Sequence, residues 1–405
     1  MLPSLRIVKG GLGRATEAIA RELAAPRPGS TTPEWSELEW QLAAAAAAHG
    51  VSPLLSKISA WQNASWQSFL ADQREHVAQR FTRIAALLEC IDRGARAAGL
   101  AILPLKGAAL HALGVYVPGE RPMADIDLLV RECDAAAASE LLEALGYVES
   151  LAVWKHRSFK PLAAQVMPGL GEHRDTQITI ELHTRTQERL PVSAVDITAR
   201  IYPATPQPGL NPYPSLGALM SHLLLHTAGN ICSRSLRLLH LNDIARLAAR
   251  MTDDDWNLLW DQAAEPPWWA LPPLRLTARY YHEAVPAAVL ARLTAGCPAL
   301  LRMTSRRQTL TQASCSDLWI QNFPGIEWSR SLREAGRYLR HRIKPGEEAH
   351  RDRMGQARTQ PWLQGQSWAR MSRGRQMLVR LTRPVPRMDA LYVVRAALAR
   401  DAAGH

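Results

Sequence analysis

The sequence has few cysteines, five in 405 residues, and no two of them lie close together. An odd number of widely spaced cysteines argues against a disulfide framework and against a cysteine-rich zinc site. No run reaches the ~18 consecutive apolar residues that a membrane-spanning helix needs, and residues 1–30 lack the apolar centre of a secretion signal. We therefore expect a cytoplasmic protein with no membrane span.

Lysine is also scarce, with six lysines against 42 arginines, and the net charge of +11 is unevenly placed. Residues 1–300 carry 28 basic and 29 acidic side chains, whereas residues 301–405 carry 20 and 8. Guanidinium groups pair with phosphates and aromatic rings stack on bases, so this last region is a candidate surface for nucleic acid or another polyanion. A solvated helical face explains the same charges. The tryptophans interleaved with these arginines are Trp319, Trp328, Trp362 and Trp368.

Hydrophobic residues make up 47% of the chain, which is enough for a packed core. At roughly 150 residues per domain, the length predicts two or three domains. The fold class that we expect is α+β, with a small mixed sheet embedded in a mostly helical chain. Periodicity and chain breaks predict a flexible lead-in over 1–32, a helical region over 33–99, an α/β core over 100–190, a helical region over 191–300, and a basic, arginine-rich, mostly helical region over 301–405.

An Asp-x-Asp pair opens one of the short apolar runs of the core. Side chains alternate along a strand, so Asp125 and Asp127 project from one face while Ile126 and Leu128 enter the core. Two neighbouring carboxylates repel each other unless cations lie between them, and paired divalent metals at phosphoryl-transfer sites are a common solution. A structural carboxylate pair is the alternative interpretation.

A third carboxylate is available on the alternating stretch 176–183. Glu181 faces away from the apolar side chains of Ile180 and Leu182, and it would join the acid pair if the two strands were neighbours. His183 shares its face and is a candidate for substrate contact or an edge-strand surface histidine. The acids at 253–255 supply a control, because they follow Thr252 and fit a solvated helix start.

Basic groups near the acids are candidates for binding phosphate. Lys106 and Gly107 form a turn from a strand into a helix, where backbone amides and an ammonium group favour phosphate. Arg121 is a candidate for neutralising a triphosphate or an ordinary loop arginine. His222 and His226 share a helix face at a zinc-binding spacing, but no third ligand is evident, so they are better explained as core or cleft-lining residues.

These motifs together resemble the uncharacterised bacterial nucleotidyltransferases of the DNA polymerase beta-like superfamily. The resemblance covers roughly residues 33–265. Its segments are Leu105-Lys106-Gly107, Arg121-Pro122-Met123 leading into Asp125-Ile126-Asp127, Leu145-Gly146-Tyr147, Ile180-Glu181-Leu182-His183, Leu223-Leu224-Leu225-His226 and Leu236-Arg237-Leu238-Leu239 followed by Asp243-Ile244-Ala245.

The resemblance implies a nucleotidyltransferase core over 100–190, with residues 191–300 completing its cleft. It implies Asp125, Asp127 and Glu181 as catalytic ligands of Mg²⁺ or Mn²⁺, with Lys106 and Gly107 at the phosphates of an NTP donor. The product would carry a nucleoside monophosphate on an acceptor hydroxyl, and Glu181 would serve the acceptor side or act as base. Ala124 stands where the family usually has serine or threonine, and this change would weaken activity.

Two other interpretations remain. In the first, the fold has lost turnover and serves as a binding module that holds RNA, a peptide or another anionic partner through residues 301–405. In the second, the chain is a helical assembly adaptor. The sequence identifies neither the acceptor nor the preferred base.

Overall fold

The computed structural model describes residues 3–26, 36–58, 61, 63–162, 171–260, 267–344, 346–347 and 371–399. No helix in these ranges is long and apolar enough to cross a membrane. The α-helices are α1 (Leu5–Ala24), α2 (Glu37–Ala47), α3 (Ser52–Ile58), α4 (Ala64–Ala97), α5 (Lys106–Ala112), α6 (Ala135–Ala144), α7 (Thr198–Ile201), α8 (Leu216–Ser233), α9 (Leu238–Ala248), α10 (Asp253–Asn257), α11 (Leu271–Tyr280), α12 (Ala287–Gly296), α13 (Ala299–Ser305), α14 (Leu310–Ala313), α15 (Leu332–Ile343), α18 (Arg373–Thr382) and α19 (Met388–Ala399).

Eight strands form two sheets among the described residues. The larger sheet has the order β3-β4-β5-β2-β1-β8 and is mixed, because β2 runs parallel to β5 and β1 parallel to β8, while the other neighbours are antiparallel. The strands are β1 (Ala101–Pro104), β2 (Asp125–Leu129), β3 (Tyr147–Ala152), β4 (Arg157–Pro161), β5 (Thr179–His183), β6 (Gln187–Arg189), β7 (Ala194–Asp196) and β8 (Gly209–Leu210), of which β6 and β7 pair separately.

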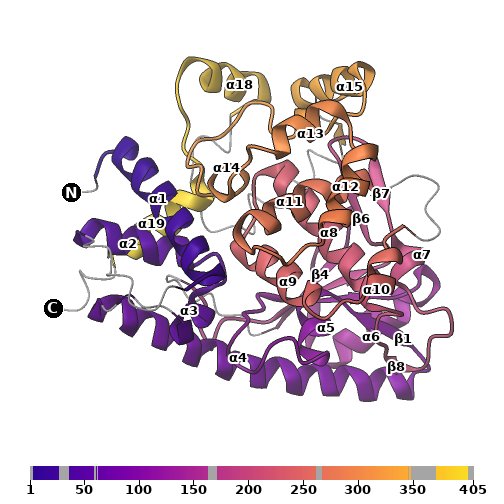
Figure 1. The fold of residues 1–405 in the computed structure, drawn as a ribbon. Coiled ribbons are helices and arrows are strands. Elements are labelled where there is room, and N and C mark those ends of the chain that lie inside the picture. The colour runs from indigo at the N-terminus through magenta and orange to yellow at the C-terminus, as the bar shows by residue number, and fades with distance from the viewer. Residues whose placement is uncertain are drawn as a thin grey trace.

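One face of the larger sheet packs against helices. Ile126 and Leu128 on β2 and Ile180 on β5 are fully buried in a cluster that includes Ile84 and Ile91 of α4. The long helix α4 runs beneath the sheet (Figure 1). Because side chains alternate along a strand, this burial turns the polar residues of β2 and β5 toward the opposite face.

A second and larger core lies among the helices. It joins α1, α2 and α3 to α8, α9 and α11, through residues such as Leu42, Leu224 and Leu274. The stretch 216–233 is buried nearly all round, which fits a helix in the centre of a domain. Helix α8 therefore lies between the helical core and the polar face of the sheet, and it contacts β6 and α5.

The expected flexible lead-in over 1–32 is wrong for most of its length. Residues 5–24 form α1, whose Val8, Leu12 and Ile19 are buried in the helical core. These residues recur at the spacing of one helix face, but Gly10, Gly11 and Gly13 interrupt the sequence pattern. Residues 27–32, the end of the expected lead-in, lie outside the described ranges.

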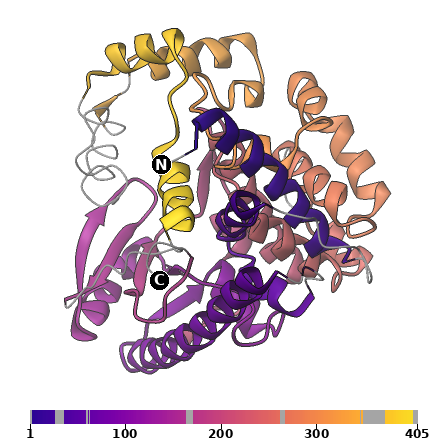
Figure 2. The ribbon, with the colours of Figure 1, turned by 90° about the vertical axis from the view of Figure 1, so that its left-hand side faces the viewer.

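The C-terminal region also contributes to the core. Helix α19 packs against α2 and buries Ala390, Val394 and Ala397, and both ribbon views place it beside the N-terminal helices (Figures 1 and 2). Trp328 is completely buried, so it offers no stacking surface to a ligand. Trp362 and Trp368 lie outside the described residues. Part of the basic C-terminal region, in α19 and around Trp328, therefore belongs to the core.

Candidate functional site

The polar face of β2 and β5 brings three carboxylates together. The parallel register aligns Asp127 directly with Glu181, and Asp125 lies one strand repeat before Asp127 on the same face. This pairing is the strand neighbourhood that the sequence analysis required. Burial, together with the negative charges of Asp127 and Glu181, raises the pKa of Asp125 to about 7. Burial is the larger cause of the raised pKa, and the two neighbouring carboxylates add to it.

Lys106 supplies the nearest positive charge. Its Nζ donates a hydrogen bond of 2.8 Å to Oδ1 of Asp127, and Nε2 of His183 lies 3.0 Å from the same oxygen. Burial alone would raise the pKa of Asp127, but Lys106 and His183 hold it well below its usual range. Burial likewise opposes the charge on Lys106, and the carboxylates overcome this effect and raise the pKa of the ammonium group. One ammonium therefore faces three acids.

The turn at Lys106 has an uncommon backbone. Lys106 begins α5 with a φ of 49°, in the left-handed region of backbone conformation that residues other than glycine seldom adopt. At the next residue, a Cβ atom on Gly107 would collide with the guanidinium of Arg121 and with the side chain of Met123. Glycine at this position is therefore required by packing. Phosphate binding by Gly107 stays a prediction.

Arg121 is held in a buried ion pair. Its guanidinium donates to both carboxylate oxygens of Asp243 on α9, and both side chains are buried. The resulting ion pair anchors the loop before β2 to the helical core. This placement corrects the expected triphosphate contact, because the guanidinium of Arg121 is already neutralised by Asp243.

A pocket of about 280 Å³ opens over the acids, between the sheet and α8. Asp125 and Glu181 reach its wall directly, whereas Asp127 is buried beside Lys106 and His183, which do line it. The charged and histidine side chains on the wall are Lys106, Asp125, Lys155, His156, Glu181, His183, Arg185, Glu188, His222 and His226.

The histidines of α8 are cleft-lining residues. His222 and His226 both face the pocket, and the hydroxyl of Tyr213 lies 2.6 Å from Nδ1 of His222. Burial and the nearby Lys106 lower the pKa of both rings well below the usual value. Neither belongs to a three-ligand cluster among the described residues. The sequence interpretation of this pair as cleft histidines, rather than zinc ligands, agrees with these positions.

His183 is not an edge-strand surface residue. β5 lies inside the sheet between β4 and β2, and His183 is buried. Next to it, Nε2 of His156, the residue immediately before β4, lies 3.3 Å from Oε1 of Glu181. The sequence analysis missed His156 because β4 was not predicted, and only the local run of basic and aromatic residues around it gave a signal.

Arg80 is a further residue that sequence reasoning missed. It lies on α4 and is 1% exposed, and its guanidinium donates to the carbonyl oxygens of Met123 and Ala124, each at 2.9 Å. It also donates to the carbonyls of Thr176 and Gln177, just before β5. Arg80 thus ties together the starts of the two strands that carry the acids. Nothing in the local sequence distinguishes it from the other arginines of α4.

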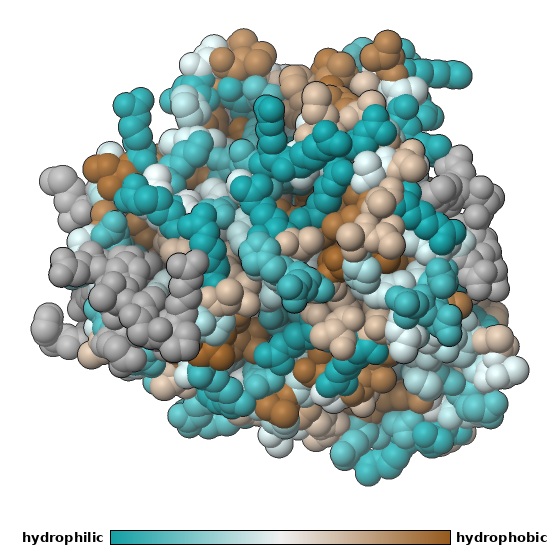
Figure 3. Space-filling model, viewed as in Figure 1, coloured by the Kyte–Doolittle hydropathy of each residue, from teal (hydrophilic) through white to brown (hydrophobic). Residues whose placement is uncertain are grey.

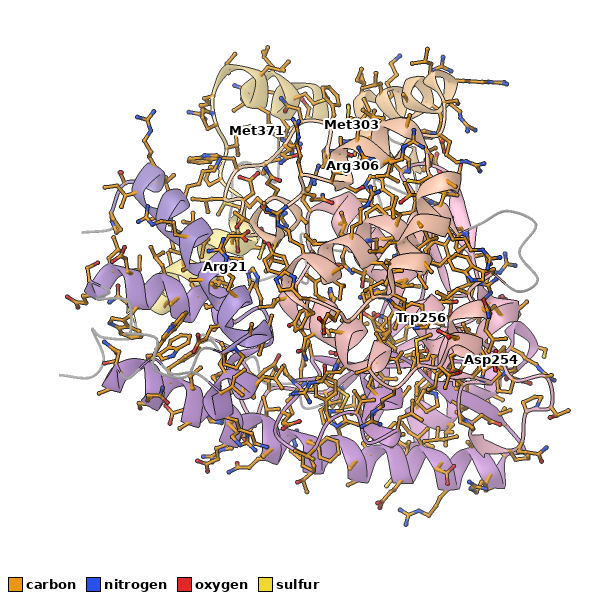
Figure 4. All side chains as sticks on the ribbon, viewed as in Figure 1. Arg21, Asp254, Trp256, Met303, Arg306 and Met371 are labelled. Atoms are coloured by element: carbon orange, nitrogen blue, oxygen red, sulfur yellow. The ribbon has the colours of Figure 1, made fainter. Side chains whose placement is uncertain are left out.

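The aspartates at 253–255 give a contrasting case. Thr252 and Asp255 form a capping box at the start of α10, where Asp253 and Asp254 are exposed. Figure 4 labels Asp254 and Trp256 on this helix, of which Asp254 is exposed and Trp256 is buried. The expected helix start is confirmed, and the triplet forms no metal cluster with neighbouring residues of the described chain.

The three adjacent acids fit a divalent cation. Carboxylate oxygens are the ligands that Mg²⁺ and Mn²⁺ prefer, and the single ammonium of Lys106 leaves the buried acids with an excess of negative charge. A mixed sheet with an acid pair on one strand and a third acid on its parallel neighbour agrees with the nucleotidyltransferase-like core that the resemblance implies.

The family described as uncharacterised nucleotidyltransferase matches residues 36–286. This match covers more than half of the chain and includes all three acids, so the chain belongs to this family, and the resemblance inferred from the sequence is confirmed. No curated protein and no solved structure matches the chain.

Proposed function

We propose that the protein is a metal-dependent nucleotidyltransferase that moves a nucleoside monophosphate from an NTP to an acceptor hydroxyl. The observation that carries this proposal is the alignment of Asp127 with Glu181 beside Asp125, at a pocket that Lys106 also lines. Asp125, Asp127 and Glu181 would hold Mg²⁺ or Mn²⁺. A divalent cation bound there lowers the pKa of a hydroxyl and neutralises phosphate oxygens.

The protein's own side chains have separable tasks in this reaction. Lys106 exchanges its bond to Asp127 for the phosphates of the donor, since it is the cation next to the acids. Glu181 accepts the proton of the acceptor hydroxyl, whose oxygen then bonds to the α-phosphorus. The bond from the α-phosphorus to the bridging oxygen breaks, and pyrophosphate leaves. Ala124 provides no hydroxyl beside Asp125, so we expect slow turnover.

The acceptor has a candidate position in an adjoining pocket of about 960 Å³. Arg185 lines both this pocket and the one over the acids. Tyr202, Trp268 and Trp269 add aromatic surface to its wall. Planar guanidinium and aromatic groups favour an acceptor that carries both negative charge and a flat ring.

Transfer of label from α-labelled NTP tests the proposal. Incubation with Mg²⁺ and a panel of small-molecule, RNA and protein acceptors should release pyrophosphate from the wild-type protein. Asp125→Asn, Asp127→Asn and Glu181→Gln should each abolish transfer, whereas Asp254→Asn, which removes an exposed acid on α10, should not change it. If the folded wild type neither binds NTP with Mg²⁺ nor transfers label, the enzyme proposal is wrong.

A binding module is the second candidate function, and it has one observation in its favour. Arg333, Arg337 and Arg340 are exposed at helical spacing on α15, and Figure 3 shows hydrophilic side chains reaching outward at the upper right, where this helix lies. Affinity of the full chain for single-stranded RNA should fall steeply with salt if this face binds phosphates. Substitution of the three arginines by glutamine should weaken that affinity, while Asp125→Asn should not.

A further inference from the structure

Two histidines and one glutamate meet on the polar face of the sheet, next to the acid pair. Nε2 of His156 lies 3.3 Å from Oε1 of Glu181, and Nε2 of His183 lies 3.7 Å from Oε2. One potential ligand atom from each of the three residues lies within 4.8 Å of the other two. No other group of three such side chains is found among the described residues.

The fold explains why these rings meet. β4 runs antiparallel to β5 with Arg157 opposite Leu182, so His156 comes one residue before this pair, next to His183. The two ring centroids are 5.1 Å apart. Both histidines line the pocket, and β5 holds Glu181 and His183 two residues apart on one face. Three ligands on two paired strands form a rigid set.

His156 is incompletely satisfied by the protein. Its Nδ1 is buried and has no hydrogen-bond partner among the described residues. The nitrogen that faces Glu181 is Nε2, at 3.3 Å, so a metal site is supported by this contact and not by Nδ1. Lys106 donates its hydrogen bond to Asp127, whereas the carboxylate of Glu181 lies next to the two histidines.

The ligand chemistry differs from that of the acid pair. Mg²⁺ prefers oxygen ligands, whereas imidazole nitrogens favour divalent transition metals, and two histidines with one carboxylate form a known catalytic zinc ligand set. We infer that His156, Glu181 and His183 form a transition-metal site of zinc type, which shares Glu181 with the oxygen site of Asp125, Asp127 and Glu181. Zinc can bind at this site whether or not the protein is an enzyme. Any role of the zinc in nucleotide transfer rests on the proposed function.

Zinc binding by the full chain tests this inference. After dialysis against a Zn²⁺ buffer with millimolar Mg²⁺ present, elemental analysis should find one equivalent of zinc per chain. His156→Gln and His183→Gln should each weaken Zn²⁺ binding by about tenfold or more, since each removes one of three ligands. His282→Gln is the matched control, because His282 is exposed and lies outside the pocket over the acids.

A spectroscopic measurement on the unaltered chain covers the case in which a variant fails to fold. X-ray absorption of the zinc-loaded wild type should show two imidazole nitrogens bound to the metal. Absence of zinc from the wild type, or equal zinc affinity in the folded His156→Gln variant, overturns the inference. A wild type that loads zinc with fewer than two imidazoles overturns it as well.

Failure of the zinc inference can be distinguished from failure of the proposed function. Asp125→Asn should lose nucleotide transfer but keep its zinc, because Asp125 is not one of the three ligands. Transfer with Mg²⁺ and no zinc binding would leave the nucleotidyltransferase standing and remove the transition-metal site. Zinc binding without NTP binding or transfer would support the transition-metal site and contradict the nucleotidyltransferase proposal.

Discussion

The guanidinium of Arg121 donates two hydrogen bonds to the carboxylate of Asp243, from Nε at 2.8 Å and from Nη2 at 2.7 Å. The hydroxyl of Tyr116 donates to the same carboxylate at 2.8 Å. This buried ion pair joins the loop that leads into β2 to helix α9, and so it couples the sheet that carries the acids to the helical core. Because Gly107 has no side chain, the guanidinium of Arg121 can lie directly beside it.

Breaking this ion pair should destabilise the protein strongly. Arg121→Met leaves the buried carboxylate of Asp243 without a countercharge, and Asp243→Asn leaves the buried guanidinium of Arg121 without one. We expect either substitution to lower the free energy of unfolding by about 3–5 kcal/mol. Urea denaturation followed by circular dichroism measures this loss. The double variant Arg121→Met/Asp243→Leu removes both charges and should recover most of it. A double variant as unstable as the singles contradicts this explanation.

Arg80 should be needed for the position of the acids as well as for stability. Arg80→Met removes the donors for the carbonyls of Met123, Ala124, Thr176 and Gln177, and it should cost at least about 3 kcal/mol, because several buried acceptors lose their partners. Arg80→Lys keeps the charge but cannot bridge both strands. We expect this folded variant to bind Mn²⁺ about tenfold more weakly, as measured by electron paramagnetic resonance. Unchanged Mn²⁺ affinity would show that Arg80 only stabilises the fold.

Local alternation predicted the central strands and the face on which each acid lies, whereas the meeting of the acids depended on the pairing of β2 with β5. Asp125 and Asp127 alternate with buried Ile126 and Leu128, and the stretch around Glu181 follows the same rule. Arg121 was assigned a different partner because Asp243, which neutralises it, is 122 residues away. His156 and Arg80 were missed for the same reason, since their contacts depend on which strands and helices pack together.

Neutralising Asp125 should make the metal-free protein more stable. Burial and the charges of Asp127 and Glu181 raise the pKa of Asp125 to about 7, so its charged form is unfavourable in the folded state. Asp125→Asn should therefore raise the free energy of unfolding by about 1–2 kcal/mol in EDTA at pH 8. Excess Mg²⁺ should stabilise the wild type more than the variant. Asp254→Asn is the control, and an Asp125→Asn variant no more stable than this control would refute the prediction.

His49 should make stability depend on pH between about 4 and 6.5. Burial, reinforced by Arg237 and Arg387, lowers the pKa of this ring to about 4, and its Nε2 lies 2.9 Å from Sγ of Cys315. As pH falls below the usual value of 6.5, the unfolded chain binds a proton at this histidine that the folded protein does not, so the contribution to stability falls with pH. At 1.36 kcal/mol per pH unit, the contribution of His49 to the free energy of unfolding should decrease by about 3 kcal/mol between pH 6.5 and pH 4. Below pH 4 it should no longer change. The difference in free energy of unfolding between wild type and His49→Gln should therefore change across this range, whereas His282→Gln should follow the wild type. Parallel profiles for wild type and His49→Gln would mean that the folded protein protonates His49 as readily as the unfolded chain.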